Sequence, residues 1–81
     1  MNTKACKALG EAIAKQRSVK DMTQESLASR VGLSPRSIQR IEAGTEQPRY
    51  ETLFNIADAL GTEPDSFILP MWACWKSCQD S

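Results

Sequence analysis

Apolar residues recur along this chain at intervals of three and four, which is the spacing of one face of an α-helix. The pattern predicts one helix from about residue 4 to 20 and another from about residue 50 to 60. A short final helix is expected after Thr62, with Pro64 near its start and Pro70 at its end, because proline suits a first helical turn and disrupts a helix interior. The apolar positions of these three helices are Ala5, Leu9, Ala12 and Ile13, then Leu53, Ile56, Ala57 and Leu60, then Phe67 and Leu69.

The stretch from residue 22 to 44 predicts two shorter helices joined by a tight turn. Thr23 can cap the first helix through its hydroxyl group, and Gly32 can take the left-handed conformation that ends it. Ser34 can cap the second helix, Pro35 suits its first position, and Gly44 ends it. The residues expected to face the core are Leu27, Ala28, Val31, Leu33, Ile38 and Ile41.

Polar side chains occupy the other face of the second of these helices. Arg36 and Arg40 lie four residues apart and therefore share a face, with Gln39 beside them and Ser37 at the margin. Arginine pairs bidentately with guanine edges and glutamine with adenine edges, while a helix N-terminus attracts phosphate. The face is typical of a helix that reads DNA, although a purely solvated helix surface can carry the same residues.

The spacing of many positions favours the first interpretation. The segments 23–28, 31–34 and 38–44, read together, resemble the phage-repressor-type (Xre/Cro-like, lambda-repressor-like) helix-turn-helix family. The resemblance continues through Pro48, residues 52–53, 56–57 and 59–61, and covers roughly residues 7 to 69. It implies an all-α, five-helix lambda-repressor-like domain over residues 4–69, followed by a short C-terminal tail of residues 70–81.

This resemblance implies a sequence-specific DNA-binding transcriptional regulator, expected to be a homodimeric repressor that reads a two-fold operator through the major groove. Arg36 and Arg40 would contact base edges, and Gln24, Ser34 and Arg49 would contact phosphates. The full set of DNA-binding residues that it implies is Thr23, Gln24, Ser34, Arg36, Ser37, Gln39, Arg40 and Arg49.

The resemblance also implies a buried ion pair between Arg17 and Glu42; the alternative is two unrelated surface charges. The chain departs from the family pattern at Gln16, where a large apolar residue is usual, and at Asp21, where glycine is frequent. Glu46 is a third departure, because it stands in the loop where family members often carry lysines against the DNA backbone. These departures predict a thinner core near Gln16 and weak backbone contacts from the loop.

The tail lies outside the resemblance and contains two tryptophans. It could fold back on the domain, contact a second copy or another protein, or lie on a membrane surface, for which its single lysine is poorly suited. Aromatic side chains are frequent anchors of interfaces. The alternative function is therefore an antitoxin-type or accessory regulator whose tail binds a second protein, and an interaction module without DNA binding is a further one. The candidate dimer or partner contacts are Phe67, Met71, Trp72 and Trp75.

Charge is unevenly divided along the 81 residues, although the net charge is zero. Residues 1–40 hold eight Lys/Arg and three Asp/Glu, whereas residues 41–81 hold two Lys/Arg and seven Asp/Glu. This polarity lets one face meet phosphate and predicts only modest non-specific affinity for DNA.

Composition excludes several other classes of protein. The chain has no histidine, and Cys6, Cys74 and Cys78 do not have the spacing of a zinc site, so we predict neither an enzyme nor a cofactor or metal. Cys74 and Cys78 would share one face of a helical tail, which leaves a redox role open beside the default of free thiols. Because the chain has no apolar run of about 20 residues and no signal-peptide region, a cytoplasmic protein without a membrane span is expected.

Overall fold

The computed structural model describes residues 3–79, with side chains from 6 to 76, and confirms the predicted all-α class. Within residues 3–79 there are five helices and no strand. None of these helices is both long and apolar enough to cross a membrane. The helices are α1 (Thr3–Val19), α2 (Gln24–Val31), α3 (Pro35–Ala43), α4 (Tyr50–Ala59) and α5 (Asp65–Gln79).

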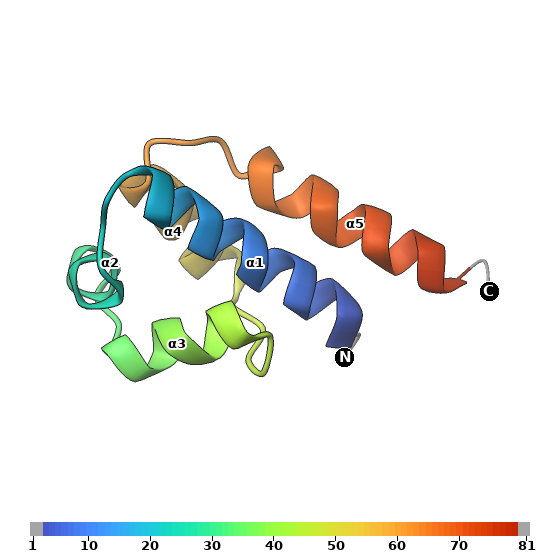
Figure 1. Cartoon of the computed structure of the whole chain (residues 1–81), viewed down its shortest axis with the longest axis horizontal. Helices are drawn as coiled ribbons and strands as arrows, with labels where there is room; N and C mark the ends of the chain where they lie inside the picture. The colour runs from blue at the N-terminus through green and yellow to red at the C-terminus, as the bar shows by residue number, and fades with distance from the viewer. Residues whose placement is uncertain (1–2, 80–81) are drawn as a thin grey trace.

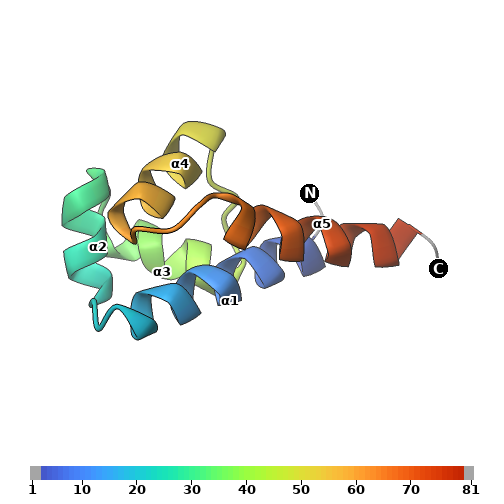
Figure 2. The same ribbon diagram turned by 90° about the horizontal axis from the view of Figure 1, so that it is seen from above.

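Helix α1 lies between α3 on one side and α5 on the other (Figure 1). Helix α2 packs on α3 and α4, which places the α2–α3 pair at one end of the molecule. The last turns of α5 extend beyond the first turn of α1, as both views show (Figure 2). The core between the helices consists of Leu9, Ile13, Leu27, Ala28, Ile38, Ile41, Leu53, Ile56, Ala57, Leu60 and Phe67.

Local signals in the sequence set the bounds of α2 and α3. Thr23 Oγ1 accepts a hydrogen bond from Ser26 N at 3.0 Å, and Ser34 Oγ accepts one from Ser37 N at 3.2 Å. The two helices end at Gly32 and Gly44, which have positive φ angles of 73° and 80°. Since these caps satisfy backbone groups that a helix terminus leaves unpaired, they fix where each short helix begins and ends.

The connection between α1 and α2 contains the departure from the family pattern at Asp21. Its φ angle is 55°, the left-handed region that glycine favours and that aspartate tolerates better than most residues. Gln16, the other departure near this point, is half-buried. The chain thus reaches α2 along the expected path, at some cost in backbone strain.

The helices α1 and α3 meet closely at Gly10. A Cβ atom at this position would lie 2.4 Å from the carbonyl oxygen of Glu42 and 2.5 Å from that of Ile41. Glycine in a helix interior is normally unfavourable. Here its missing side chain lets α1 rest against the last turn of α3, and this contact fixes the position of α3.

The prediction that Pro70 ends the final helix is wrong. Helix α5 continues through Pro70 to Gln79, so the boundary predicted between domain and tail lies inside one continuous helix. Pro70 is exposed and costs the helix one backbone hydrogen bond. Ile68 and Met71 lie on either side of it and both pack against the core. We attribute the continuation to this packing, which the sequence rule for proline ignores.

A candidate nucleic-acid interface

The outer face of α3 carries the side chains that the sequence singled out. Ile38 and Ile41 are 0% and 1% exposed, so they anchor the inner face of α3 in the core. Arg36, Gln39 and Arg40 are exposed as a result. Among the side chains that the structure describes, only Arg17 and Glu42 form an ion pair, so neither arginine of α3 is held in a salt bridge. The face is cationic and open to a ligand.

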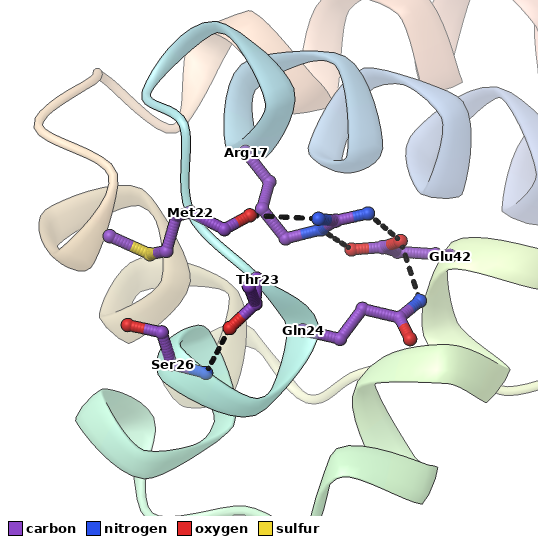
Figure 3. A network of polar contacts seen from close by, with 6 residues as sticks. All are labelled: Arg17, Met22, Thr23, Gln24, Ser26 and Glu42. Atoms are coloured by element: carbon purple, nitrogen blue, oxygen red, sulfur yellow. Dashed lines mark hydrogen bonds and ion pairs between the residues drawn. The ribbon is translucent and has the colours of Figure 1, made fainter.

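An ion pair links α1 to the end of α3 (Figure 3). Arg17 Nε donates to Glu42 Oε2 at 2.7 Å, and Arg17 Nη2 donates to Glu42 Oε1 at 3.1 Å. Arg17 Nη1 also donates to the carbonyl oxygen of Met22 at 2.8 Å. The hydrogen bond from Arg17 to the Glu42 carboxylate raises the pKa of the guanidinium; burial opposes this effect and the charge of Glu42 adds to it. This pair holds the C-terminal turn of α3 to the start of the segment that leads into α2.

Gln24 joins the same network from the first residue of α2 (Figure 3). Its Nε2 atom donates to Glu42 Oε1 at 3.0 Å. An amide nitrogen carries two hydrogens, so one of them remains for a ligand such as a phosphate oxygen. The predicted phosphate-binding side chain is therefore held in place by Glu42, a contact that the sequence did not indicate.

A surface hollow of about 660 Å³ separates the start of α2 from the start of α3. Its lining residues are Thr23, Gln24, Glu25, Pro35, Arg36 and Gln39. The structure therefore brings four of the expected DNA-binding residues, Thr23, Gln24, Arg36 and Gln39, to one depression. The same depression also contains one carboxylate, that of Glu25.

The remaining predicted DNA contacts lie around this hollow or along α3. Ser34 is exposed at the cap of α3, and its hydroxyl donates to Ser37 Oγ at 3.2 Å. Arg40 lies in the last turn of α3 and does not line the hollow. Arg49 is exposed directly before α4 and makes no side-chain capping bond, as expected for a poor cap. The predicted residues thus follow α3 and the starts of the helices beside it.

A second surface of interest is an aromatic surface on α5, which we define as Leu69, Trp72 and Trp75. These side chains are 60%, 54% and 43% exposed. Lys76 Nζ lies 5.9 Å from the ring centroid of Trp72, one turn away along the helix. Leu69 was expected in the core, but it is exposed because it lies two residues after the buried Phe67 in the same helix, and residues two apart do not share a face.

The candidate contacts on α5 do not all belong to this surface. Phe67 is 0% exposed and lies in the core, so its inclusion among the contacts is corrected: it anchors α5 to the domain. Met71 is half-buried beneath Trp72 and Trp75, with which it lines a smaller hollow. Cys6 is buried and Cys74 half-buried, both as free thiols, whereas the side chain of Cys78 lies outside the described residues.

Sequence reasoning overlooked three side chains at these surfaces. Glu25 was noted only as part of the family pattern, but it lies in the first turn of α2 and lines the same hollow as Gln24. Tyr50 is 76% exposed and lines the hollow beneath the tryptophans. Leu69 would have been placed correctly if helical spacing had been applied from Phe67, because the two residues do not share a helix face.

Two capped helices joined by a tight turn, with the polar face of the second one exposed, define a helix-turn-helix domain. A helix-turn-helix family model matches residues 13–67 of this chain. An uncharacterized HTH-type transcriptional regulator, y4dJ of Sinorhizobium fredii, is 33% identical over 64 residues, which cover 79% of this chain and 83% of that protein. The chain therefore belongs to the helix-turn-helix family of DNA-binding transcriptional regulators.

Solved structures share the arrangement of the helices. The clp gene regulator ClgR from Corynebacterium glutamicum matches with a TM-score of 0.80 at 24% identity, over 94% of this chain and 83% of that chain. The restriction-modification controller protein C.AhdI from Aeromonas hydrophila matches with a TM-score of 0.74 at 26% identity, over 76% of this chain and 94% of that chain. The predicted all-α helix-turn-helix fold is thereby confirmed.

Proposed function

We propose that this protein is a sequence-specific DNA-binding repressor that inserts α3 into the major groove of an operator half-site. The observation that carries the proposal is the exposure of Arg36 and Arg40, without carboxylate partners among the described side chains, on a helix whose opposite face is buried. In this geometry Arg36 and Arg40 contact base edges and Gln39 and Ser37 add secondary contacts. The backbone contacts come from Thr23, Gln24, Ser34 and Arg49.

Selection of bound duplexes from random DNA tests this function directly. We expect an enriched sequence with two half-sites about one helical turn apart, because a two-fold dimer presents its recognition helices at that spacing. Enrichment of no sequence, with wild-type protein that is folded by circular dichroism, would contradict the proposal and favour a protein-interaction module.

The substitution Arg40→Ala should weaken binding to the selected duplex strongly and binding to random DNA little. Loss of an arginine–guanine pair removes about 1–3 kcal/mol of discrimination, which corresponds to about five- to 150-fold in the dissociation constant. Fluorescence anisotropy with both duplexes measures the effect. Arg30→Ala is the matched control, because Arg30 is also exposed near the end of a helix but lies beside α4, away from α3.

An equal loss of affinity on both duplexes would mean that Arg40 contacts only the DNA backbone. Arg49 serves as the comparison for such behaviour. Removing a phosphate contact weakens binding alike on all sequences and reduces the salt slope by about one. Arg49→Ala should therefore show the pattern that Arg40→Ala does not.

We infer further that two copies pair through the aromatic surface of α5. Leu69, Trp72 and Trp75 recur every three residues along one helix and are about half exposed, which is unusual for large apolar side chains of a monomer. Tryptophan is among the residues that contribute most to interface energy. Helix α5 also lies across α1 from α3, so pairing here leaves the α3 face free for DNA.

The substitution Trp72→Ala should shift the protein from dimer to monomer. Loss of a central aromatic anchor costs at least about 2 kcal/mol, or about 30-fold in the dimer dissociation constant. Sedimentation equilibrium over a range of concentrations measures it. Phe54→Ala is the control, because Phe54 is a 50% exposed aromatic residue on α4 and not on α5.

The antitoxin-type or accessory role is the second candidate, and the same exposed tryptophans favour it. A wild-type protein that stays monomeric at all concentrations would contradict pairing through α5. In that case the surface would be assigned to a different protein, and tryptophan fluorescence would shift to the blue when the partner covers the rings.

A further inference from the structure

We propose that Glu25 acts as an electrostatic brake on DNA binding, by opposing the phosphates that the start of α2 approaches. This inference rests on the proposed function, since it concerns the same face of the molecule. It assigns to a single carboxylate the control of how tightly the protein binds DNA of any sequence.

Glu25 lies on the face of the molecule that is proposed to meet DNA. Glu25 is exposed and lines the hollow between α2 and α3, together with Gln24 and Arg36. It follows directly after Gln24, whose amide is fixed by Glu42 and keeps one hydrogen for a phosphate oxygen. Because both side chains line this hollow, a phosphate bound at Gln24 would lie within the electrostatic range of the Glu25 carboxylate.

The charge of the Glu25 carboxylate determines how it acts on DNA. Glu25 forms no ion pair with the described side chains, including Arg36 of the same hollow, so its carboxylate is not held in a salt bridge. Two unlike outcomes could result from a carboxylate on a DNA-binding face: attraction to a base amine or repulsion of the backbone. Its place on the first turn of α2, and not on α3, favours repulsion of the backbone.

This repulsion matters for affinity because the protein carries no overall positive charge. With ten Lys/Arg and ten Asp/Glu in the protein, the attraction of this face for DNA depends on local groups such as Arg36 and Arg40, and a carboxylate beside them reduces it. Glu25 also stabilises α2, because an acidic side chain in the first turn interacts favourably with the helix dipole. If Glu25 only stabilised α2, removal of its charge would change the folding stability and leave the affinity for DNA unchanged.

The test is the affinity of the Glu25→Gln variant for a labelled duplex of random sequence. Glutamine preserves the shape of the side chain and removes its charge. We expect binding to tighten about three- to tenfold at low salt, the size of one charge–charge interaction near a wet surface. The gain should be larger at about 0.01 M salt than at about 0.15 M, because the Debye length falls from about 30 Å to about 8 Å.

Asp65→Asn is the matched control. Asp65 is an exposed acidic residue in the first turn of α5, which lies across α1 from α3, and its neutralisation changes the net charge of the protein by the same amount. In about 0.1 M salt, where the Debye length is about 10 Å, its affinity for DNA should stay within about twofold of the wild type. Thermal unfolding of both variants establishes that the compared proteins are folded.

The outcomes separate this inference from the proposed function. Wild-type protein that binds DNA, with Glu25→Gln of unchanged affinity, would overturn the brake and leave the proposed function intact. A loss of affinity confined to the selected duplex would also overturn it, because Glu25 would then accept a hydrogen bond from a base. Equal tightening by Asp65→Asn would assign the effect to net charge alone, against the brake. Wild-type protein that binds neither duplex would refute both proposals.

Discussion

Replacing Glu42 with alanine should lower the free energy of unfolding by about 3–5 kcal/mol, the usual cost of removing one partner of a buried ion pair. The Glu42 side chain is 8% exposed and that of Arg17 is 21% exposed. The carboxylate accepts two hydrogen bonds from Arg17 and one from Gln24. Its removal leaves the guanidinium with Met22 as its hydrogen-bond acceptor among the described residues.

Urea denaturation followed by circular dichroism measures this loss. Small domains are stable by only about 5–15 kcal/mol, so Glu42→Ala can leave the chain largely unfolded. The double variant Arg17→Met/Glu42→Leu keeps the test informative, because an apolar pair of similar volume often restores the stability that one unpaired charge removes. We therefore expect the double variant to be more stable than Glu42→Ala.

The control for Glu42 is Glu63→Ala, which removes an exposed carboxylate outside the helices. Its effect should be within about 0.5 kcal/mol. A loss below about 1 kcal/mol for Glu42→Ala would place the pair among solvent-exposed salt bridges and contradict its structural role.

The substitution Gly10→Ala should destabilise the fold by about 3 kcal/mol or more, because a methyl group at this site forces backbone atoms apart. The added Cβ would lie 2.4 Å from the Glu42 carbonyl oxygen, well inside van der Waals contact. Relief of the clash requires α1 and the last turn of α3 to separate. That movement would also lengthen the ion pair between Arg17 and Glu42, so the two effects are coupled.

The sign of the change in stability on Gly10→Ala distinguishes a close helix–helix contact from a free helix. On a free helix, alanine in place of glycine stabilises by about 1 kcal/mol. Thermal or urea unfolding therefore distinguishes the two situations without reliance on the size of the change. Ser18→Ala, an exposed position on the same helix, should change stability by less than about 0.5 kcal/mol. A more stable Gly10→Ala variant would contradict the close contact of α1 with α3.

The sequence predicted those parts of the fold that local chemistry decides. Thr23, Ser34, Gly32 and Gly44 bound α2 and α3 where the caps were expected, since capping depends on residues within one turn. Pro70 misled the prediction because the local cost of a proline is outweighed by packing on α1, which the sequence alone does not show. Gly10 carries a signal that could have been used: a glycine within a helical pattern often marks the approach of another backbone.

The candidate site was predictable to a similar extent. Alternation of buried Ile38 and Ile41 with polar residues determines that Arg36 and Arg40 face outward. The resemblance to the family also implied the pair of Arg17 with Glu42, which is present. The hydrogen bond from Gln24 to Glu42 depends on how α2 docks against α3, a tertiary relation that no local pattern encodes. The DNA contacts themselves remain predictions.

Pro70 has a consequence for the way α5 can be used. A synthetic peptide of residues 65–79 should be largely unstructured in water, because short isolated helices are marginal and this one also lacks an internal backbone donor. The aromatic surface therefore exists in its helical form only while α5 rests on α1. Anything that loosens the contact of α5 with α1 should expose the stretch after Pro70 to proteases and remove the helical form of the aromatic surface.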